Sequence, residues 1–147
     1  MKPFYWGTLL LLALLSAPNL FAGPPSDRDA TAKLVGVWTV PPKEYTNVAG
    51  PGEITFKPDG TFSSTGFFKV GDVEMQLDVE GKWKVKGGVL VEEITKTSLP
   101  HVAAVGLTTR DTLLELTDKQ YRFRSEDGHE ALRVRKQQTG SSSGENE

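Results

Sequence analysis

Residues 72–86 read DVEMQLDVEGKWKVK, and their side chains alternate between apolar and polar along the whole stretch. One face carries only charged and amide side chains, and the other comprises Val73, Met75, Leu77, Val79, Gly81, Trp83 and Val85. A period of two predicts a β-strand with one buried face and one wet face. An extended strand of this length would measure about 50 Å. We therefore expect a bend or bulge near Gly81, where the side chain is missing.

Five turn signals let the same alternation be followed through the neighbouring strands. They lie at 58–60, 70–71, 87–88, 118–119 and 127–128, and they predict hairpins with short loops. The predicted partners are Phe56 with Phe62, Phe68 with Val73, Gly66 with Met75, Val85 with Leu90, Leu116 with Tyr121, Leu114 with Phe123, Phe123 with Leu132, and Tyr121 with Val134. Every pairing keeps one face of the sheet apolar, as a consistent register requires.

The pattern predicts an all-β domain of eight antiparallel strands. The expected strands are 33–40, 53–57, 60–69, 72–86, 88–96, 111–117, 119–126 and 129–136. No long helical period is available to cover the apolar face, so we expect the sheet to close into an up-and-down barrel. The apolar connection 97–110 is long enough for a short helix, near 98–108, or a lid across one mouth of the barrel.

The composition describes one small domain without disulfides. The chain has 147 residues, a formal net charge of −2 and no cysteine. This charge gives phosphate backbones nothing to attract, so nucleic acid is not an expected partner. We expect the domain at residues 31–136, with flexible tails at 23–30 and 137–147, because those segments are almost free of apolar side chains.

The first 22 residues predict an export signal. Lys2 precedes an apolar run over 6–15, and Pro18 and Asn19 break that run before Ala22. The run is too short to cross a bilayer. We expect cleavage after Ala22 and a protein in the periplasm or outside the cell, without a lipid anchor because there is no cysteine. The lack of disulfides favours a bacterial envelope.

Three segments carry a resemblance to a known family. They are LVGVW at 34–38, FKPDGTF at 56–62 and GKWKV at 81–85. Together they resemble small lipocalin-like domains exported by bacteria, most of which have no assigned activity, and the resemblance extends over 33–136. It implies a lipocalin barrel in which Trp38, following Gly36, closes one end beneath an arginine of the last strand, Arg133 or Arg135. The domain is short for a lipocalin and no helix is expected after its last strand, so fold transfers better than function.

Glu92 is the residue with the most informative predicted position. A two-residue turn at 87–88 sets Glu92 opposite Trp83, inside the barrel, where a buried charge requires a partner or a ligand. A bulge at 92–93 would instead turn both glutamates outward, and the sequence leaves both arrangements open. It also leaves open whether the barrel is hollow, as the small inward residues Ser64 and Gly66 favour, or filled by aromatic rings. The predicted ligand-contacting residues are Phe62, Ser64, Phe68, Met75, Trp83, Glu92, Tyr121 and Phe123.

The remaining charged residues predict a solvated surface. The turn register places Arg122, Arg124, Arg133, Arg135 and Lys136 on the outer face of the last two strands, with Arg122 opposite Arg133 and beside Glu115. A solvated ladder of charges accounts for this pattern, and a surface for an acidic partner or anionic lipid is the alternative. The stretch 126–130, EDGHE, has a spacing that would suit a metal, but an Asp-Gly turn explains it, so no metal site is predicted.

No catalytic constellation is recognisable in the sequence. The two histidines lie far apart, and there is neither a cysteine nor a Gly-x-Ser-x-Gly motif. We expect no catalytic residue, no cofactor and no enzymatic activity. The expected function is binding of a small, mostly apolar molecule inside the barrel. The alternative is a protein-binding module, such as an inhibitor of an envelope or secreted protease, acting through its rim loops or its amino-terminal tail.

Overall fold

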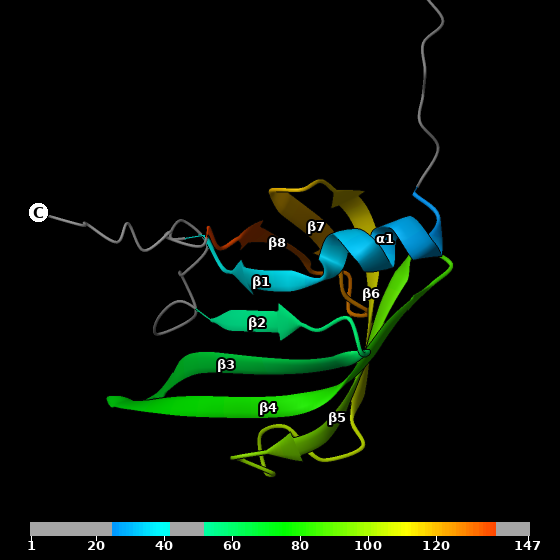
Figure 1. Ribbon diagram of the computed structural model, residues 1–147. Coiled ribbons are helices and arrows are strands. Elements are labelled where there is room, and N and C mark those ends of the chain that lie inside the picture. The colour runs from blue at the N-terminus through cyan, green and yellow to red at the C-terminus, as the bar shows by residue number, and fades with distance from the viewer. Residues whose placement is uncertain (1–24, 42–51, 138–147) are drawn as a thin grey trace, which may run out of the picture.

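Eight antiparallel strands form a closed barrel in the order of the sequence, in the computed structural model, which describes residues 25–41 and 52–137. Figure 1 shows the strands following one another around the barrel. The elements are α1 Asp27–Leu34, β1 Gly36–Thr39, β2 Glu53–Phe56, β3 Thr61–Val70, β4 Val73–Lys86, β5 Val89–Thr97, β6 Thr108–Leu116, β7 Gln120–Arg124 and β8 Glu130–Arg135. The barrel closes where β1 pairs with β8. The predicted all-β, eight-stranded up-and-down barrel is confirmed.

Two of the predicted hairpins have the expected register beside their turns. Phe56 pairs with Phe62 across the loop 58–60. Val85 pairs with Leu90 across the turn at 87–88, where both glycines have a positive φ. The bulge expected near Gly81 is also present, between Glu80 and Gly81. A Cβ on Gly81 would lie 2.1 Å from the Glu93 carbonyl oxygen, so glycine alone allows the two strands to approach here.

The hairpin between β3 and β4 is longer than predicted. Val70 pairs with Val73, so the turn consists of Gly71 and Asp72 and not of residues 70–71. Phe68 therefore pairs with Met75, two residues beyond the predicted partner. A shift of two residues leaves every side chain on its predicted face.

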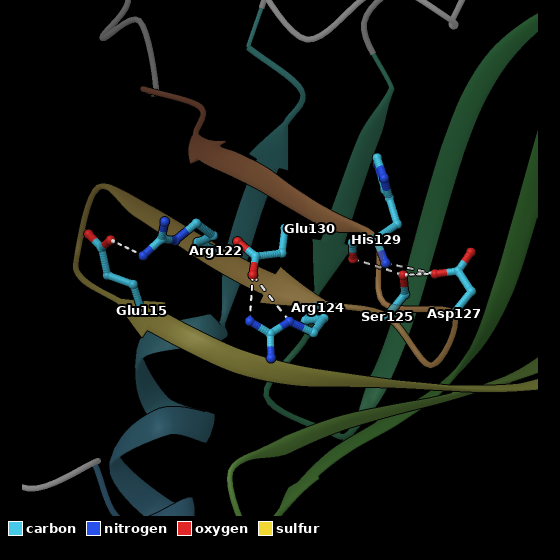
Figure 2. A network of polar contacts seen from close by, with 7 residues as sticks. All are labelled: Glu115, Arg122, Arg124, Ser125, Asp127, His129 and Glu130. Carbon is cyan, nitrogen blue, oxygen red and sulfur yellow. Dashed lines mark hydrogen bonds and ion pairs between the residues drawn. The ribbon is translucent and has the colours of Figure 1, made fainter.

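The hairpin between β7 and β8 differs from the prediction by one residue, which reverses a face. Phe123 pairs with Ala131, and Tyr121 pairs with Arg133, not with Val134. The loop has three residues, 126–128, since the backbone amide of Gly128 donates to the Ser125 carbonyl and that of Ser125 to the His129 carbonyl. Asp127 also accepts from the Ser125 hydroxyl and the His129 amide, as Figure 2 shows. The predicted placement of Arg133 and Arg135 on the outer face is therefore wrong.

A bulge in β6 changes a second register. Leu116 pairs with Tyr121 as predicted, but Leu113, and not Leu114, pairs with Phe123. The irregularity lies between Leu113 and Glu115. Because a bulge adds one residue to one strand, it exchanges the inward and outward positions before it. The inward residues of β6 thus become Leu113 and Asp111.

Residues 27–34 form a helix that the alternation did not predict. Ser26 caps it: the Ser26 hydroxyl accepts from the Asp29 amide and donates to the Asp29 carboxylate. The prediction of a tail reaching residue 30 is wrong from Asp27 onward, and the first strand begins at Gly36, not at residue 33. Figure 1 shows α1 beside β1 at one end of the barrel, where Ala30 and Leu34 are buried.

The connection between β5 and β6 contains turns and no helix, so the short helix expected near 98–108 is wrong. Only isolated turn bonds form there, such as those from Val102 and Ala103 to the Leu99 carbonyl. Strand β6 also begins earlier than expected, at Thr108. Ala103 packs into the core while Val102, Val105 and Leu107 are exposed.

The two ends of the barrel differ in their packing. At the helix end, Trp38, Phe56, Phe62, Trp83 and Leu90 fill the interior and are almost completely buried. Phe56 and Trp83 lie with ring centroids 4.8 Å apart, and the Trp83 indole donates to the Lys57 carbonyl. This half of the barrel is therefore solid.

The predicted export signal at 1–22 and the tail at 138–147 lie outside the described residues. Within 25–41 and 52–137, no helix is long and apolar enough to span a bilayer.

Candidate functional site

The half of the barrel opposite the helix contains a partly open cavity of about 230 Å³. Its lining residues come from all eight strands or the chain beside them: Val40, Gly52, Glu53, Ile54, Ser64, Thr65, Gly66, Phe67, Phe68, Leu77, Glu92, Asp111, Tyr121, Phe123 and Arg133. The cavity persists because β3 presents Ser64 and Gly66 where larger side chains would fill the space. A Cβ on Gly66 would meet no heavy atom within 4 Å.

Five of the eight predicted ligand-contacting residues line this cavity: Ser64, Phe68, Glu92, Tyr121 and Phe123. Phe62 and Trp83 do not, because they pack in the solid half of the barrel. Met75 points the same way as Leu77 but lies nearer the β3–β4 turn, outside the lining set. No residue of 98–107 lines the cavity, so the connection expected to form a lid does not contact it.

Glu92 lies inside the barrel. It pairs with Trp83 on one side and with Thr109 on the other, with no bulge at 92–93. Burial raises the pKa of Glu92 from 4.5 to about 7, and the nearby Asp111 carboxylate is the second cause of the rise. The positive charge of Arg133 acts in the opposite direction and lowers this pKa. Glu92 can therefore change its charge near neutral pH.

Asp111 and Arg133 accompany Glu92 in the cavity wall. Asp111 pairs with Leu90 across β5 and β6, and burial raises the pKa of its carboxyl group. Arg133 enters the cavity from β8, opposite Tyr121, with its guanidinium 5.5 Å from the centre of the Phe123 ring. These residues also line an open hollow that reaches the β7–β8 turn at Glu126 and Asp127. The cluster thus lies where the cavity and this open hollow meet.

Tyr121 forms the floor of the cavity. Its ring meets Trp38 edge to face, with centroids 4.9 Å apart, and lies 5.7 Å from that of Phe123. Burial raises the pKa of its phenol far above the ordinary value, so the hydroxyl remains neutral. Tyr121 therefore joins the solid half of the barrel to the hollow half and offers a neutral polar group.

Arg135 closes the helix end, the role that the resemblance assigned to Arg133 or Arg135. Its guanidinium lies 4.1 Å from the centre of a Trp38 ring. It donates to the backbone carbonyls of Lys33 and Val35 at the end of α1, and to the backbone carbonyl of Asp118 between β6 and β7. Gly36 has a φ of +133°, and a Cβ there would meet Arg135 at 2.3 Å. Arg133, by contrast, belongs to the cavity.

The outer face of the last strands carries a ladder of opposite charges (Figure 2). Arg124 pairs with Glu130 at 2.6 Å and Arg122 with Glu115 at 4.0 Å. Arg122 lies opposite Leu132 and not opposite Arg133 as predicted, so the two arginines are not cross-strand partners. Both ion pairs are substantially exposed, so they contribute little to stability. The described residues contain no group of three or more metal-ligating side chains.

Sequence reasoning missed Asp111 as a cavity residue and misplaced Arg133 on the surface. For Arg133 a signal was present, because a closing Arg135 requires the arginine two residues before it to face inward as well. For Asp111 there was none, since the β6 bulge leaves no mark in the alternation.

Comparisons with known proteins assign the chain to no family. No protein-family model matches the chain, and no curated protein matches it. Among solved structures, it is similar to a lipocalin-like protein from Bacteroides uniformis ATCC 8492, with 14% sequence identity and a TM-score of 0.49. The similarity covers 71% of this chain and 99% of that one. The strand order of this chain itself gives the eight-stranded up-and-down barrel, the architecture of lipocalins.

Proposed function

We propose that this chain is an exported, non-catalytic binding protein that holds a small, mostly apolar molecule in the hollow half of its barrel. The observation that carries the proposal is the cavity of about 230 Å³. For comparison, a cavity of about 150 Å³ holds benzene. The wall of the cavity in this barrel combines apolar side chains such as Ile54, Phe68 and Leu77 with a few convergent polar groups. That combination is typical of small-molecule sites.

The driving force for binding would be the removal of apolar surface from water. Each Å² contributes about 25 cal/mol. The polar groups around Glu92 would orient the ligand, because a buried polar group that finds no partner is costly. The solid half of the barrel, packed around Trp38 and Phe56, holds the cavity wall in place.

Filling the cavity tests the proposal. Ser64→Leu places a larger side chain into the cavity, whereas Ser63→Leu makes the same change on the neighbouring residue, which pairs with Glu80 on the outer face. Gly66→Leu is a second filling variant with open space for its Cβ. We expect both filling variants to lose binding of a small apolar ligand such as propylbenzene, measured by calorimetry, and Ser63→Leu to retain it. Equal binding by all three variants would refute an internal site.

Export is a separate part of the proposal. It predicts that the full chain, expressed in a bacterial host, appears in the periplasm or medium with Gly23 as its first residue. Intact-mass measurement of the exported protein tests this. A product that retains residues 1–22, or that remains in the cytoplasm, would contradict it.

A second candidate function is protein binding through the rim. The exposed apolar side chains of Val102, Val105 and Leu107, at 46%, 61% and 46% exposure, favour it. This candidate predicts inhibition of a secreted or envelope protease in an activity panel, and loss of that inhibition in Val105→Asp. Propylbenzene binding would be unchanged in the same variant.

A further inference from the structure

The charged residues that line the cavity are mostly acidic. They are Glu53, Glu92, Asp111 and Arg133. Lys136 forms an ion pair with Glu53, which leaves two carboxyl groups and one guanidinium for an occupant to meet. The open hollow beside the cavity is acidic too, since Glu126 and Asp127 join the same cluster there while Arg110 lies 3.8 Å from Glu126. The interior therefore has more carboxylates than cations.

Arg133 attracts both carboxylates electrostatically but forms no direct ion pair with either of them. Among the described residues, no oxygen of Glu92 or Asp111 lies within 4.0 Å of a nitrogen of Arg133 in an ion pair. The Arg133 guanidinium instead donates to the neighbouring Leu132 carbonyl and lies over the Phe123 ring. Glu92 and Asp111 raise each other's energy when both are ionised, because like charges repel.

Three classes of polar group can be compared at this position. A carboxylate would meet Arg133, but it would also face Glu92 and Asp111, and such a juxtaposition costs several kcal/mol. A wholly apolar molecule would displace water from all three charged side chains and leave them without new partners. An ammonium group would be repelled by Arg133, but it would face two carboxyl groups against one guanidinium and would lower the mutual repulsion of the two carboxylates. Of the three, only the ammonium group complements the charge of the wall.

We propose that the cavity binds a small apolar molecule that ends in a protonated amine, with Glu92 and Asp111 receiving the ammonium group. This inference rests on the proposed function and specifies its ligand class. The volume of the cavity suits an aromatic ring with a chain of two or three atoms. The ring would lie among Ile54, Phe68 and Leu77, and the charged end would point toward the middle of β5 and β6.

Binding of the amine is expected to be linked to proton release. The groups facing Glu92 are Asp111 from β6, Tyr121 from β7 and Arg133 from β8, while its β4 neighbour, Trp83, carries no charge. Burial and Asp111 keep the Glu92 carboxyl protonated up to about pH 7, where its pKa lies. An ammonium group beside it favours the ionised form, so binding below that pH expels a proton.

The test uses three probes of similar shape and different charge: 2-phenylethylammonium, 3-phenylpropanoate and propylbenzene. Calorimetry at about pH 8, where Glu92 is ionised, should show the ammonium probe binding at least about tenfold more tightly than the other two. Glu92→Gln should weaken that binding at least about tenfold, and Asp111→Asn provides a second variant. Glu93→Gln is the matched control, because Glu93 is the next residue of β5 and is exposed outside the barrel.

The pH dependence separates a direct charge contact from a structural effect. For the natural chain, affinity for 2-phenylethylammonium should fall between about pH 8 and about pH 5.5, whereas Glu92→Gln should show a smaller fall. The number of protons released should follow from titrations in buffers of different ionisation enthalpy. An affinity that does not change with pH overturns the proposal.

The probes also distinguish this inference from the proposed function. If propylbenzene binds as tightly as the amine, and Ser64→Leu abolishes its binding, the cavity is a ligand site but the amine assignment is wrong. Preference for 3-phenylpropanoate would overturn the assignment in favour of Arg133 as the anchoring group. If none of the three probes binds, the ligand class and the proposed function both fail.

Discussion

Replacing Glu92 with glutamine should make the protein more stable at neutral and alkaline pH. The structure raises the pKa of Glu92 from 4.5 to about 7, so the folded state holds a proton that the unfolded chain has already released. Between these two values the unfolded state binds fewer protons, and stability falls as pH rises. At about 1.4 kcal/mol for each pH unit, the loss amounts to about 3 kcal/mol once pH exceeds 7. Glutamine carries no charge and avoids this loss.

Urea unfolding measured at a series of pH values, from about 4 to about 9, would test this expectation. The quantity to follow is the difference in unfolding free energy between Glu92→Gln and the natural chain. We expect it to be smallest near pH 4.5 and to increase toward about 3 kcal/mol above pH 7. Shifts at the exposed carboxylates are common to both proteins and largely cancel in the difference. A difference that does not vary with pH, or one equal to that of Glu93→Gln, would refute the reasoning.

Three further variants test other parts of the barrel by thermal or urea unfolding. Arg135→Ala should lower the free energy of unfolding by about 3 kcal/mol, because it removes the cation stacked on Trp38 and its hydrogen bonds to backbone carbonyls. The control Arg122→Ala, on the outer face, should lower it by less than about 1 kcal/mol. Gly81→Ala should cost about 2 kcal/mol or more, because its Cβ would lie 2.1 Å from a carbonyl oxygen, whereas Gly66→Ala should be nearly neutral. The Asp27 carboxylate accepts hydrogen bonds from the backbone amides of Gly87 and Gly88 in the β4–β5 turn. Asp27→Ala should therefore lower the melting temperature and speed hydrogen exchange at these two amides. Unchanged exchange would contradict the contact.

Strand alternation predicted the barrel because most of the chain obeys a period of two without interruption. The positions of Phe56 and Val85 followed directly from it, since the loops between their strands have the lengths that their residues favour, and Glu92 adopts the inward one of the two arrangements that the sequence left open. The register was lost where a loop or a strand held one extra residue. The Asp127–Gly128 sequence suits a two-residue turn, but Ser125 and His129 close a three-residue loop, which was not encoded in the alternation.

The candidate site was predicted only in part for the same reason. Its apolar wall lies on strands whose inward faces were predicted correctly, and Glu92 faces inward, one of the two arrangements that the sequence left open. Asp111 and Arg133 lie beyond the β6 bulge and the β7–β8 loop, where a one-residue change exchanges inside and outside. The helix was missed because its eight residues carry only two buried side chains, and its capping serine was not weighed.

The contacts of Arg135 determine when the barrel can become complete during synthesis. This side chain joins the last strand to the Val35 carbonyl, 100 residues earlier in the sequence. A ribosome must therefore release nearly the whole domain before the first and last strands can meet, and native contacts of such long range form slowly. Until then the nascent polypeptide has two open sheet edges, which can pair with the edges of other chains.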